Sequence, residues 1–320
     1  MRAIVAGGAG FVGSHLCDAL LGEGFEVLCL DNLVTGHARN IAHLRDQPRF
    51  SYQRHDVCEP FAAQADWVFQ LASPASPPRY LERPVETLMV NAVGTKNLLD
   101  LALASNARFL IASTSEVYGD PEVHPQPESY RGSVSCTGPR SCYDEGKRFG
   151  EALAMAYYRK HDLDVRIIRI FNTYGPRLDP GDGRVVSNFL AQVVRGESLT
   201  IYGSGEQTRS FCYVSDLVAG ILAVMRHEAA RGEVFNLGNP AEITMRELEQ
   251  TIQRVLGTQL PVTFAPLPED DPKRRKPDIT KARSTLGWEP KVPLLDGLGQ
   301  TAEWFQRELA AARPAARTAN

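Results

Sequence analysis

A tyrosine and a lysine four residues apart are the first side chains in this sequence that point to chemistry. Tyr143 and Lys147 form the pattern Y-x-x-x-K, and residues at this spacing share one face of a helix. The lysine charge favours phenolate, so we expect it to lower the tyrosine pKa from about 10. The tyrosine then becomes a usable base toward a hydroxyl near neutral pH. The same spacing is also common on ordinary helix surfaces.

A second polar group follows a predicted buried strand at 108–113. Thr114 can donate or accept a hydrogen bond at a hydroxyl that is being oxidised, and Ser115 and Glu116 follow it directly. Ligands of parallel sheets bind at the carboxyl ends of the strands, where we expect these residues to lie. The alternative is a Ser/Thr loop that caps its own backbone, which suits Ser113 better than the whole set.

Glycines at the first predicted strand–helix turn indicate a dinucleotide site. Gly7, Gly10 and Gly13 form G-x-x-G-x-x-G, which permits a tight turn, close approach of a pyrophosphate and close helix–strand packing. The start of the following helix favours phosphate. Asp31 ends the second strand 18 residues after Gly13, and a carboxylate there binds a ribose 2′-hydroxyl, which predicts NAD rather than NADP. Asp56 is a candidate for the adenine edge or, equally, a solvated loop aspartate.

Alternating strands and helices must position these residues. Apolar runs predict buried strands at 2–6, 25–30, 67–72, 108–113 and 165–171. Helical patterns lie near 11–21, 85–105 and 143–161. The alternation predicts an α/β fold with a doubly wound parallel (Rossmann) sheet. We assign residues 1–172 to an NAD-binding domain, to which the chain returns near 211–238, and residues 173–320 to a smaller C-terminal α+β substrate-binding part.

The composition is that of an ordinary globular protein. The 320 residues carry a net charge of -3 and are 43% hydrophobic, which excludes disordered, collagen-like and coiled-coil chains. The balanced charge gives no reason to expect nucleic acid or an anionic membrane as a partner, and no apolar run approaches the roughly 20 residues that span a bilayer. Six scattered cysteines form no C-x-x-C pair, so we expect a reduced, cytoplasmic protein without a metal site.

Longer segments carry a resemblance that covers nearly the whole chain. Besides the glycine pattern, Thr114, Tyr143 and Lys147, they are LASPASP (71–77), TSEVYGDP (114–121), CYDEGKR (142–148), RIFNTYGPR (169–177), DGRVVSNF (182–189), QTRSF (207–211), DDP (270–272) and RKPDI (275–279). These segments resemble the nucleotide-sugar enzymes of the extended short-chain dehydrogenase/reductase superfamily, and especially their UDP-glucuronate decarboxylase (UDP-xylose synthase) branch.

The resemblance implies NAD as the cofactor, UDP-glucuronate as the substrate and UDP-xylose as the product. It implies a catalytic set made of Thr114, Ser115, Glu116, Tyr143 and Lys147. It implies cofactor contacts from Gly7, Gly10, Phe11, Val12, Gly13, Asp31, Asn32, Asp56, Val57, Leu71, Ala72, Tyr143 and Lys147. It implies substrate contacts from Tyr80, Asn172, Val186, Tyr202, Arg209 and Arg275. The arginines suit the UDP end because a planar guanidinium can bind two phosphate oxygens. Helices near 85–104 and 153–158 correspond to the family's dimer interface, which implies a homodimer.

The two residues after Thr114 separate related reactions of this superfamily. Sugar 4,6-dehydratases have Asp-Glu there, whereas this chain has Ser115 and Glu116, and serine is a poor acid for expelling hydroxide. The 4-epimerases generally carry small or neutral residues at both positions. The resemblance therefore implies decarboxylation, in which C4 oxidation gives a β-keto acid that loses CO2 before C5 is protonated and C4 is reduced. The alternatives are a UDP-sugar 4-epimerase, a decarboxylase that releases the 4-keto sugar, and a non-enzymatic nucleotide sensor.

Overall fold

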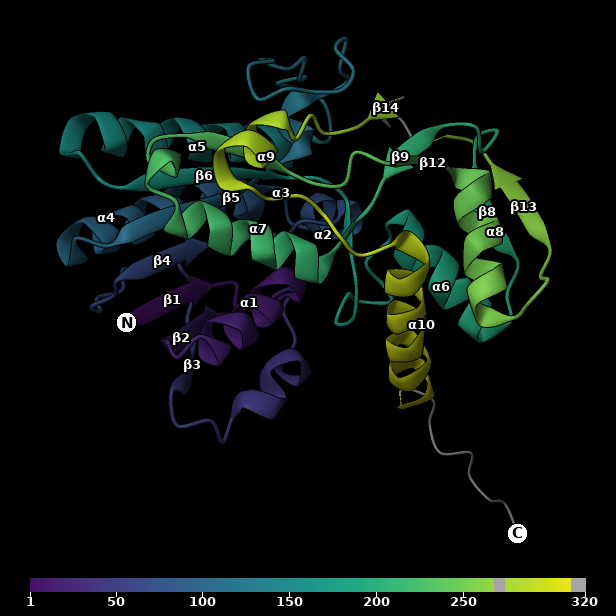
Figure 1. The fold of residues 1–320 in the computed structure, drawn as a ribbon, viewed down its shortest axis with the longest axis horizontal. Coiled ribbons are helices and arrows are strands. Elements are labelled where there is room, and N and C mark those ends of the chain that lie inside the picture. Colours follow the sequence, from purple (N-terminus) through teal and green to yellow (C-terminus); the bar gives the residue numbers. More distant parts are fainter. Residues whose placement is uncertain (268–273, 312–320) are drawn as a thin grey trace.

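A seven-stranded parallel sheet forms the centre of the computed structural model, which describes residues 1–267 and 274–311 (Figure 1). Its strands are β1 (Arg2–Ala6), β2 (Glu26–Asp31), β3 (Phe50–Arg54), β4 (Trp67–Gln70), β5 (Arg108–Thr114), β6 (Val165–Ile170) and β11 (Val234–Leu237). Their order is β11-β6-β5-β4-β1-β2-β3, with every neighbouring pair parallel. The order reverses between β1 and β4, so the predicted doubly wound sheet is confirmed.

Alternate residues of each strand build a core on either face of the sheet. In β1, Ala3 and Val5 pack into one cluster with α1 (Phe11–Gly22) and α7 (Val214–Arg226). Ile4 and Ala6 pack into the other cluster with α4 (Thr95–Ser105) and α5 (Ser141–His161). Because helices cover both faces, the strands are continuous apolar runs rather than alternating ones.

The predicted helix at 85–105 consists of three consecutive segments. Helix α3 (Pro84–Met89) leads into η2 (Val90–Gly94), one wider π-helical turn, and then into α4. Within η2, Asn91 Nδ2 donates hydrogen bonds to Ser73 Oγ (3.0 Å) and to the carbonyl of Thr87 (2.8 Å). The wider turn thus directs the Asn91 side chain to the loop after β4. Single π-helical turns of this kind are frequent at functional sites.

Helix α5 lies close to the sheet because two of its glycines face its neighbours. A Cβ atom at Gly150 would lie 2.9 Å from Cδ1 of Ile111, and one at Gly146 would lie 3.4 Å from Nδ2 of Asn91. The two glycines are four residues apart, like Tyr143 and Lys147 on the same helix. Tyr143, Gly146, Lys147 and Gly150 therefore lie on one face of α5, and the missing side chains of the two glycines let that face approach η2 and β5 closely.

The remaining elements form shorter connections and the smaller part of the chain. The connections are η1 (Ala38–Leu44), α2 (Pro77–Glu82), η3 (Ser115–Tyr118), β7 (Thr173–Tyr174), β10 (Cys212–Tyr213) and η4 (Glu228–Ala230). The smaller part contains α6 (Val185–Arg195), β8 (Leu199–Tyr202), β9 (Thr208–Ser210), β12 (Glu242–Thr244), α8 (Met245–Leu256), β13 (Val262–Ala265), β14 (Arg274–Arg275), α9 (Thr280–Leu286) and α10 (Leu294–Ala311). Figure 1 shows α6, α8, β8 and β13 grouped beside the main sheet.

The chain returns to the main sheet by one strand rather than by two. Strand β11 pairs with β6, but β10 pairs with β7 in a separate two-stranded sheet. Strand β10 spans only two residues before α7 begins, which leaves it too short to extend the sheet. The segment near 211–238, where we expected the chain to return to this domain, therefore contributes α7 and β11 to it. The DDP motif at 270–272 lies outside the described residues.

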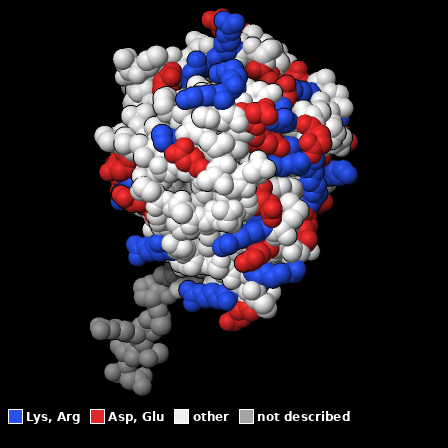
Figure 2. All heavy atoms as spheres, turned by 90° about the vertical axis from the view of Figure 1, so that its left-hand side faces the viewer, with Lys and Arg blue, Asp and Glu red and all other residues white. Residues whose placement is uncertain are grey.

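Charges of both signs lie close together on one face of the molecule. On the face that Figure 2 shows, Lys and Arg side chains alternate with Asp and Glu around an uncharged area. No helix among residues 1–267 and 274–311 is long and apolar enough to cross a bilayer. The same residues contain no group of three His, Cys, Asp or Glu side chains that could hold a metal ion.

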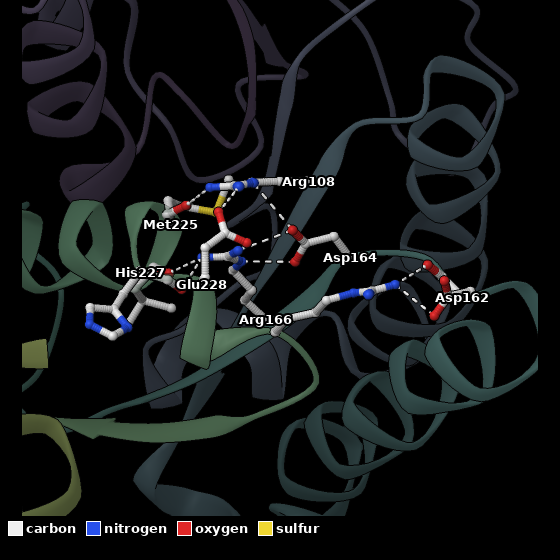
Figure 3. A network of polar contacts seen from close by, with 9 residues as sticks. Arg108, Asp162, Asp164, Arg166, Met225, His227 and Glu228 are labelled. Atoms are coloured by element: carbon white, nitrogen blue, oxygen red, sulfur yellow. Dashed lines mark hydrogen bonds and ion pairs between the residues drawn. The ribbon is translucent and has the colours of Figure 1, made fainter. Parts of the chain in front are cut away.

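A buried arginine joins the amino-terminal edge of the sheet to the end of α7 (Figure 3). Arg166 of β6 has no solvent exposure, and it donates from Nε and Nη2 to Asp164 (2.9 and 3.0 Å) and from Nη1 to the carbonyl of His227 (2.8 Å). Arg108 of β5 adds a bond to the Met225 carbonyl (3.0 Å). The last carbonyls of a helix lack intrahelical partners, so these two arginines satisfy them for α7.

Candidate active site

A cavity of about 1180 Å³ opens at the carboxyl ends of the sheet strands. Every residue that the sequence analysis proposes for cofactor, substrate or catalysis lines it. These residues come from the loops after β1, β2, β3, β4, β5 and β6 and from the smaller part of the chain. The fold thus brings together positions that are as far apart in sequence as Gly7 and Arg275.

The loop after β1 has no room for side chains. Gly7 has a φ of +80°, and a Cβ atom there would lie 2.8 Å from the backbone nitrogen of Ala72. Gly10 is the N-cap of α1, and Phe11 and Val12 follow it in the first turn at the cavity wall. The first amides of a helix have no partners within the helix. They form a cradle that fits a pyrophosphate.

Asp31 sits at the end of β2 with an exposed fraction of 7%. Its Oδ2 accepts a hydrogen bond from the Ala9 amide (2.9 Å), and its Oδ1 accepts one from the Leu33 amide (2.8 Å). Burial raises the pKa of Asp31, and these backbone bonds oppose the shift. The carboxylate therefore fixes the glycine loop, and because two oxygens offer about four lone-pair sites, it also retains capacity for a ribose hydroxyl.

Asp56 follows β3 and organises its own loop. Its Oδ1 accepts a bond from the Cys58 amide (2.9 Å), and its Oδ2 accepts one from Asn32 Nδ2 (3.1 Å). Asn32 and Val57 line the same end of the cavity. These contacts fit the predicted adenine end, and they also explain a loop aspartate without any ligand.

Tyr143 and Lys147 lie on one face of α5, as their spacing predicts. The Tyr143 ring is buried and stacks on Tyr80 with centroids 4.9 Å apart and planes 5° from parallel. Lys147 Nζ donates to the Ala112 carbonyl (2.9 Å) and lies 5.8 Å from the Tyr143 centroid. The aromatic stack and the strand carbonyl thus fix both side chains of the pair.

Burial, rather than the lysine charge, has the largest effect on the pKa values of Tyr143 and Lys147. It raises the pKa of Tyr143 to about 12, against a hydrogen bond with Thr114 that acts in the opposite direction. It lowers the pKa of Lys147 to about 8. The expected fall of the Tyr143 pKa below its usual value is therefore not seen in this structure, because a desolvated site penalises phenolate and ammonium alike.

Glu116 is an ionised carboxylate held between two guanidinium groups. Arg275 donates to both of its oxygens, with Nη2 at 2.8 Å from Oε2, and Arg140 also donates to Oε2. Burial alone would raise the pKa of Glu116, but Arg275 and then Arg140 outweigh it and lower the pKa. Arg275, which we expected at the UDP end, thus lies beside the expected catalytic residues.

The Ser/Thr segment at the end of β5 caps its own backbone in part, but through Thr114 rather than Ser113. Thr114 Oγ1 accepts a bond from the Glu116 amide (3.2 Å) at the start of η3. Ser113 Oγ instead donates to Glu151 Oε1 (2.5 Å). Ser115 is buried at the cavity wall between Thr114 and Glu116.

Two further arginines, Arg140 and Arg184, line the cavity although they were not predicted as site residues. Arg140 immediately precedes α5 and binds Glu116. Arg184 precedes α6 and donates from Nη2 to Asp182 (2.9 Å). Burial lowers the pKa of Arg184, but Asp182, and to a smaller extent Tyr143, outweigh it and raise the pKa. Arg184 lies in a segment that carries the family resemblance, so its position was available as a signal. Nothing in the local sequence indicates that Arg140 reaches Glu116.

Comparison with known proteins identifies the family. Residues 3–238 match the model of the "NAD dependent epimerase/dehydratase family". The chain belongs to this family. Its NAD dependence confirms the predicted cofactor. UDP-glucuronic acid decarboxylase 1 of Xenopus tropicalis is 52% identical over 96% of this chain and 73% of that protein. UDP-glucuronic acid decarboxylase 5 of Arabidopsis thaliana is 51% identical over 97% and 90%. The predicted resemblance to the decarboxylase branch is thus confirmed.

A solved family member shows that the likeness extends to the fold. The UDP-glucuronic acid 4-epimerase of Bacillus cereus, solved with UDP-glucuronic acid and NAD, has a TM-score of 0.87 and is 28% identical. The alignment covers 96% of this chain and all of that one. The family therefore places decarboxylases and epimerases on one scaffold, and the side chains at the site must decide between them.

Proposed function

We propose that this chain is an NAD-dependent carboxy-lyase that converts UDP-glucuronate to UDP-xylose and CO2. The observation that carries the proposal is the Glu116 carboxylate, held by Arg140 and Arg275 beside Thr114 and Tyr143. The names of the curated relatives support the same reaction. The chain thus pairs a dehydrogenase site with an acid–base group that an epimerase does not need.

Tyr143 takes the proton of the C4 hydroxyl, and Thr114 orients that hydroxyl by a hydrogen bond. The glycine loop and Asp31 would hold NAD, which would supply the oxidising power for C4 and the hydride for its later reduction. Lys147 adds a positive charge near the phenolate. A ketone at C4 is β to the carboxylate that C5 carries. This β-keto acid loses CO2, and no hydroxyl group has to be expelled.

Ser115 and Glu116 serve the second half of the reaction. The enolate left by CO2 loss must gain a proton at C5, and Glu116 orders a water or moves that proton. Ser115 orients the substrate carboxylate. Because Ser115 cannot expel hydroxide as an acid, the pair favours decarboxylation over dehydration.

The two parts of the chain divide the binding work. Residues 1–172, together with the segment that returns near 211–238, hold NAD through the glycine loop, Asp31 and the loop that carries Asp56. Residues 173–320 close over the UDP-sugar. The residues proposed to contact the substrate are Tyr80 and Asn172, which the first part contributes, and Val186, Tyr202, Arg209 and Arg275 of the second part, all at the cavity wall.

One reaction mixture in heavy water separates this proposal from its alternatives. We expect UDP-glucuronate to give UDP-xylose with one deuteron at C5, an equal amount of CO2 and no accumulation of NADH, as followed by NMR and mass spectrometry. A product that keeps its carboxylate and differs only at C4 would make the chain an epimerase, which the Bacillus cereus structure brings into consideration. NADH with a 4-keto sugar would indicate release of the intermediate. The neutral isostere Glu116→Gln should slow the formation of UDP-xylose strongly.

We further propose a cytoplasmic homodimer. All six cysteines are free thiols, which suits a reducing compartment. Helix α3 packs on α5, and both expose large apolar side chains: Val85 at 65%, Met89 at 46% and Phe149 at 51%. An exposed apolar cluster of this kind is typical of an interface with a second copy.

Phe149→Glu should convert the dimer to a monomer, because burying a charged side chain within this apolar cluster carries a large desolvation penalty. Light scattering coupled to size exclusion measures the mass. Phe264→Glu is the matched control, since Phe264 is 54% exposed on β13 in the smaller part. A wild-type monomer, or a dimer that persists in the Phe149 variant, would contradict the proposed interface.

A further inference from the structure

We infer that Glu151 is a positioning residue for the reaction: from behind the catalytic side chains, it fixes the strand end that carries Thr114 and holds Lys147 in its charged form. This inference deepens the proposed function and rests on it. Glu151 lies one helical turn after Lys147 on α5, beneath the cavity wall.

The Glu151 carboxylate is a junction between two strands and the catalytic helix. Its Oε1 accepts bonds from Ser113 Oγ (2.5 Å) of β5 and from Arg169 Nε (2.9 Å) of β6, and its Oε2 accepts one from Arg169 Nη2 (2.7 Å). The Glu151 and Arg169 side chains are each 13% exposed. Since Ser113 directly precedes Thr114, the carboxylate anchors the end of β5 at the point where the hydroxyl of the substrate is recognised.

The arginine is itself fixed from the opposite side. Arg169 Nη1 donates to Tyr118 Oη (3.0 Å), and Tyr118 Oη donates to Asn236 Oδ1 (2.7 Å) on β11. Tyr118 is 1% exposed and Asn236 is fully buried. The network therefore spans β5, β6 and β11, and Glu151 is its member on the catalytic helix. A charged network of this kind holds its members in one geometry.

Electrostatics connect this junction to Lys147. Burial lowers the pKa of Lys147 to about 8, and the negative charge of Glu151 opposes that shift. The charged groups that face the Glu151 carboxylate are Arg169 from β6 and Lys147 from its own helix, while β5 contributes the Ser113 hydroxyl and η2 contributes the uncharged Asn91 near Gly150. Glu151 therefore shares its charge between two cations. Without the Glu151 charge, the charged form of Lys147 is less stable in this desolvated site.

Glu151→Gln tests the charge with almost no change in shape. An ammonium that loses a nearby anion gives up its proton more readily, so the alkaline limb of the kcat profile should move down by about one pH unit. KM for UDP-glucuronate should stay within about twofold, because the residue acts through Lys147 and not on the substrate. Ser113→Ala is the matched control: it removes one hydrogen bond of the carboxylate but keeps its charge, so the limb should not move.

Arg169→Gln provides a second, opposite test. It removes the cation that competes for Glu151, so the alkaline limb should move up, whereas loosened packing alone gives no reason for opposite shifts. If Glu151→Gln does not fold, the direction of the Arg169→Gln shift decides. An unmoved limb in Glu151→Gln, an equal shift in Ser113→Ala, or a downward shift in Arg169→Gln would overturn the inference. Wild-type formation of UDP-xylose tests the proposed function separately, so the two can fail independently.

Discussion

Tyr143→Phe should lower kcat by about 10²–10⁴-fold, the range that a positioned acid–base group contributes. The variant removes the hydroxyl that takes the C4 proton but keeps the ring that stacks on Tyr80 at 4.9 Å. Binding of UDP, measured by titration calorimetry, should therefore change little. Turnover is measured as CO2 and UDP-xylose formed.

Tyr157→Phe is the matched control for this loss. Tyr157 lies on the same helix, and its hydroxyl donates to Asp100 Oδ1 (2.5 Å) on α4, away from the cavity. This variant should keep turnover within about twofold, because a hydrogen bond of this kind contributes only about 1 kcal/mol to stability. Near-normal turnover in Tyr143→Phe would remove the tyrosine from the mechanism.

Arg166→Met should lower the free energy of unfolding by about 1–3 kcal/mol, the cost of leaving a buried hydrogen-bonding group unsatisfied, because Asp164 is 20% exposed and keeps its ion pair with Arg108 at 3.2 Å. The substitution leaves Asp164 without its closest cation and leaves the carbonyls of Val224 and His227 without this donor. Methionine fills the space but offers no N–H group. Denaturant unfolding followed by circular dichroism measures the loss.

Arg231→Met serves as the control on the neighbouring strand connection. Arg231 pairs with Asp162 at 2.6 Å, but the two side chains are 39% and 85% exposed. Exposed pairs contribute about 0–1 kcal/mol, so this variant should unfold almost like the wild type. Equal losses in both variants would mean that burial of the Arg166 network has no special weight.

Local sequence patterns predicted what depends on neighbours along the chain. The apolar runs gave the core strands, and the glycine spacing placed the loop after β1, because these features need only the local backbone and one buried face. Position at the ends of parallel strands then placed Thr114 and Asp31 at one cavity, since topology brings those ends together.

Features that depend on distant partners could not be predicted in this way. Strand β10 has an apolar sequence, and its pairing with β7 follows from geometry across 37 intervening residues of chain. The Tyr143 pKa follows from burial on all sides rather than from Lys147. The bond between Ser113 and Glu151 joins residues 38 positions apart. Each of these outcomes is decided by contacts that a short sequence window does not contain.

The glycines of α5 determine how closely this helix can approach its neighbours. A methyl group at Gly150 would lie 2.9 Å from Cδ1 of Ile111, so that side chain would have to shift or the helix would have to move outward, whereas one at Gly146 would meet Asn91 at an ordinary contact distance of 3.4 Å. Tyr143 and Lys147 lie on the same helix, so a movement of α5 changes their distances from Thr114 and Ala112. The absence of a side chain at Gly150 therefore keeps the helix that carries the base close to the strand that presents the substrate.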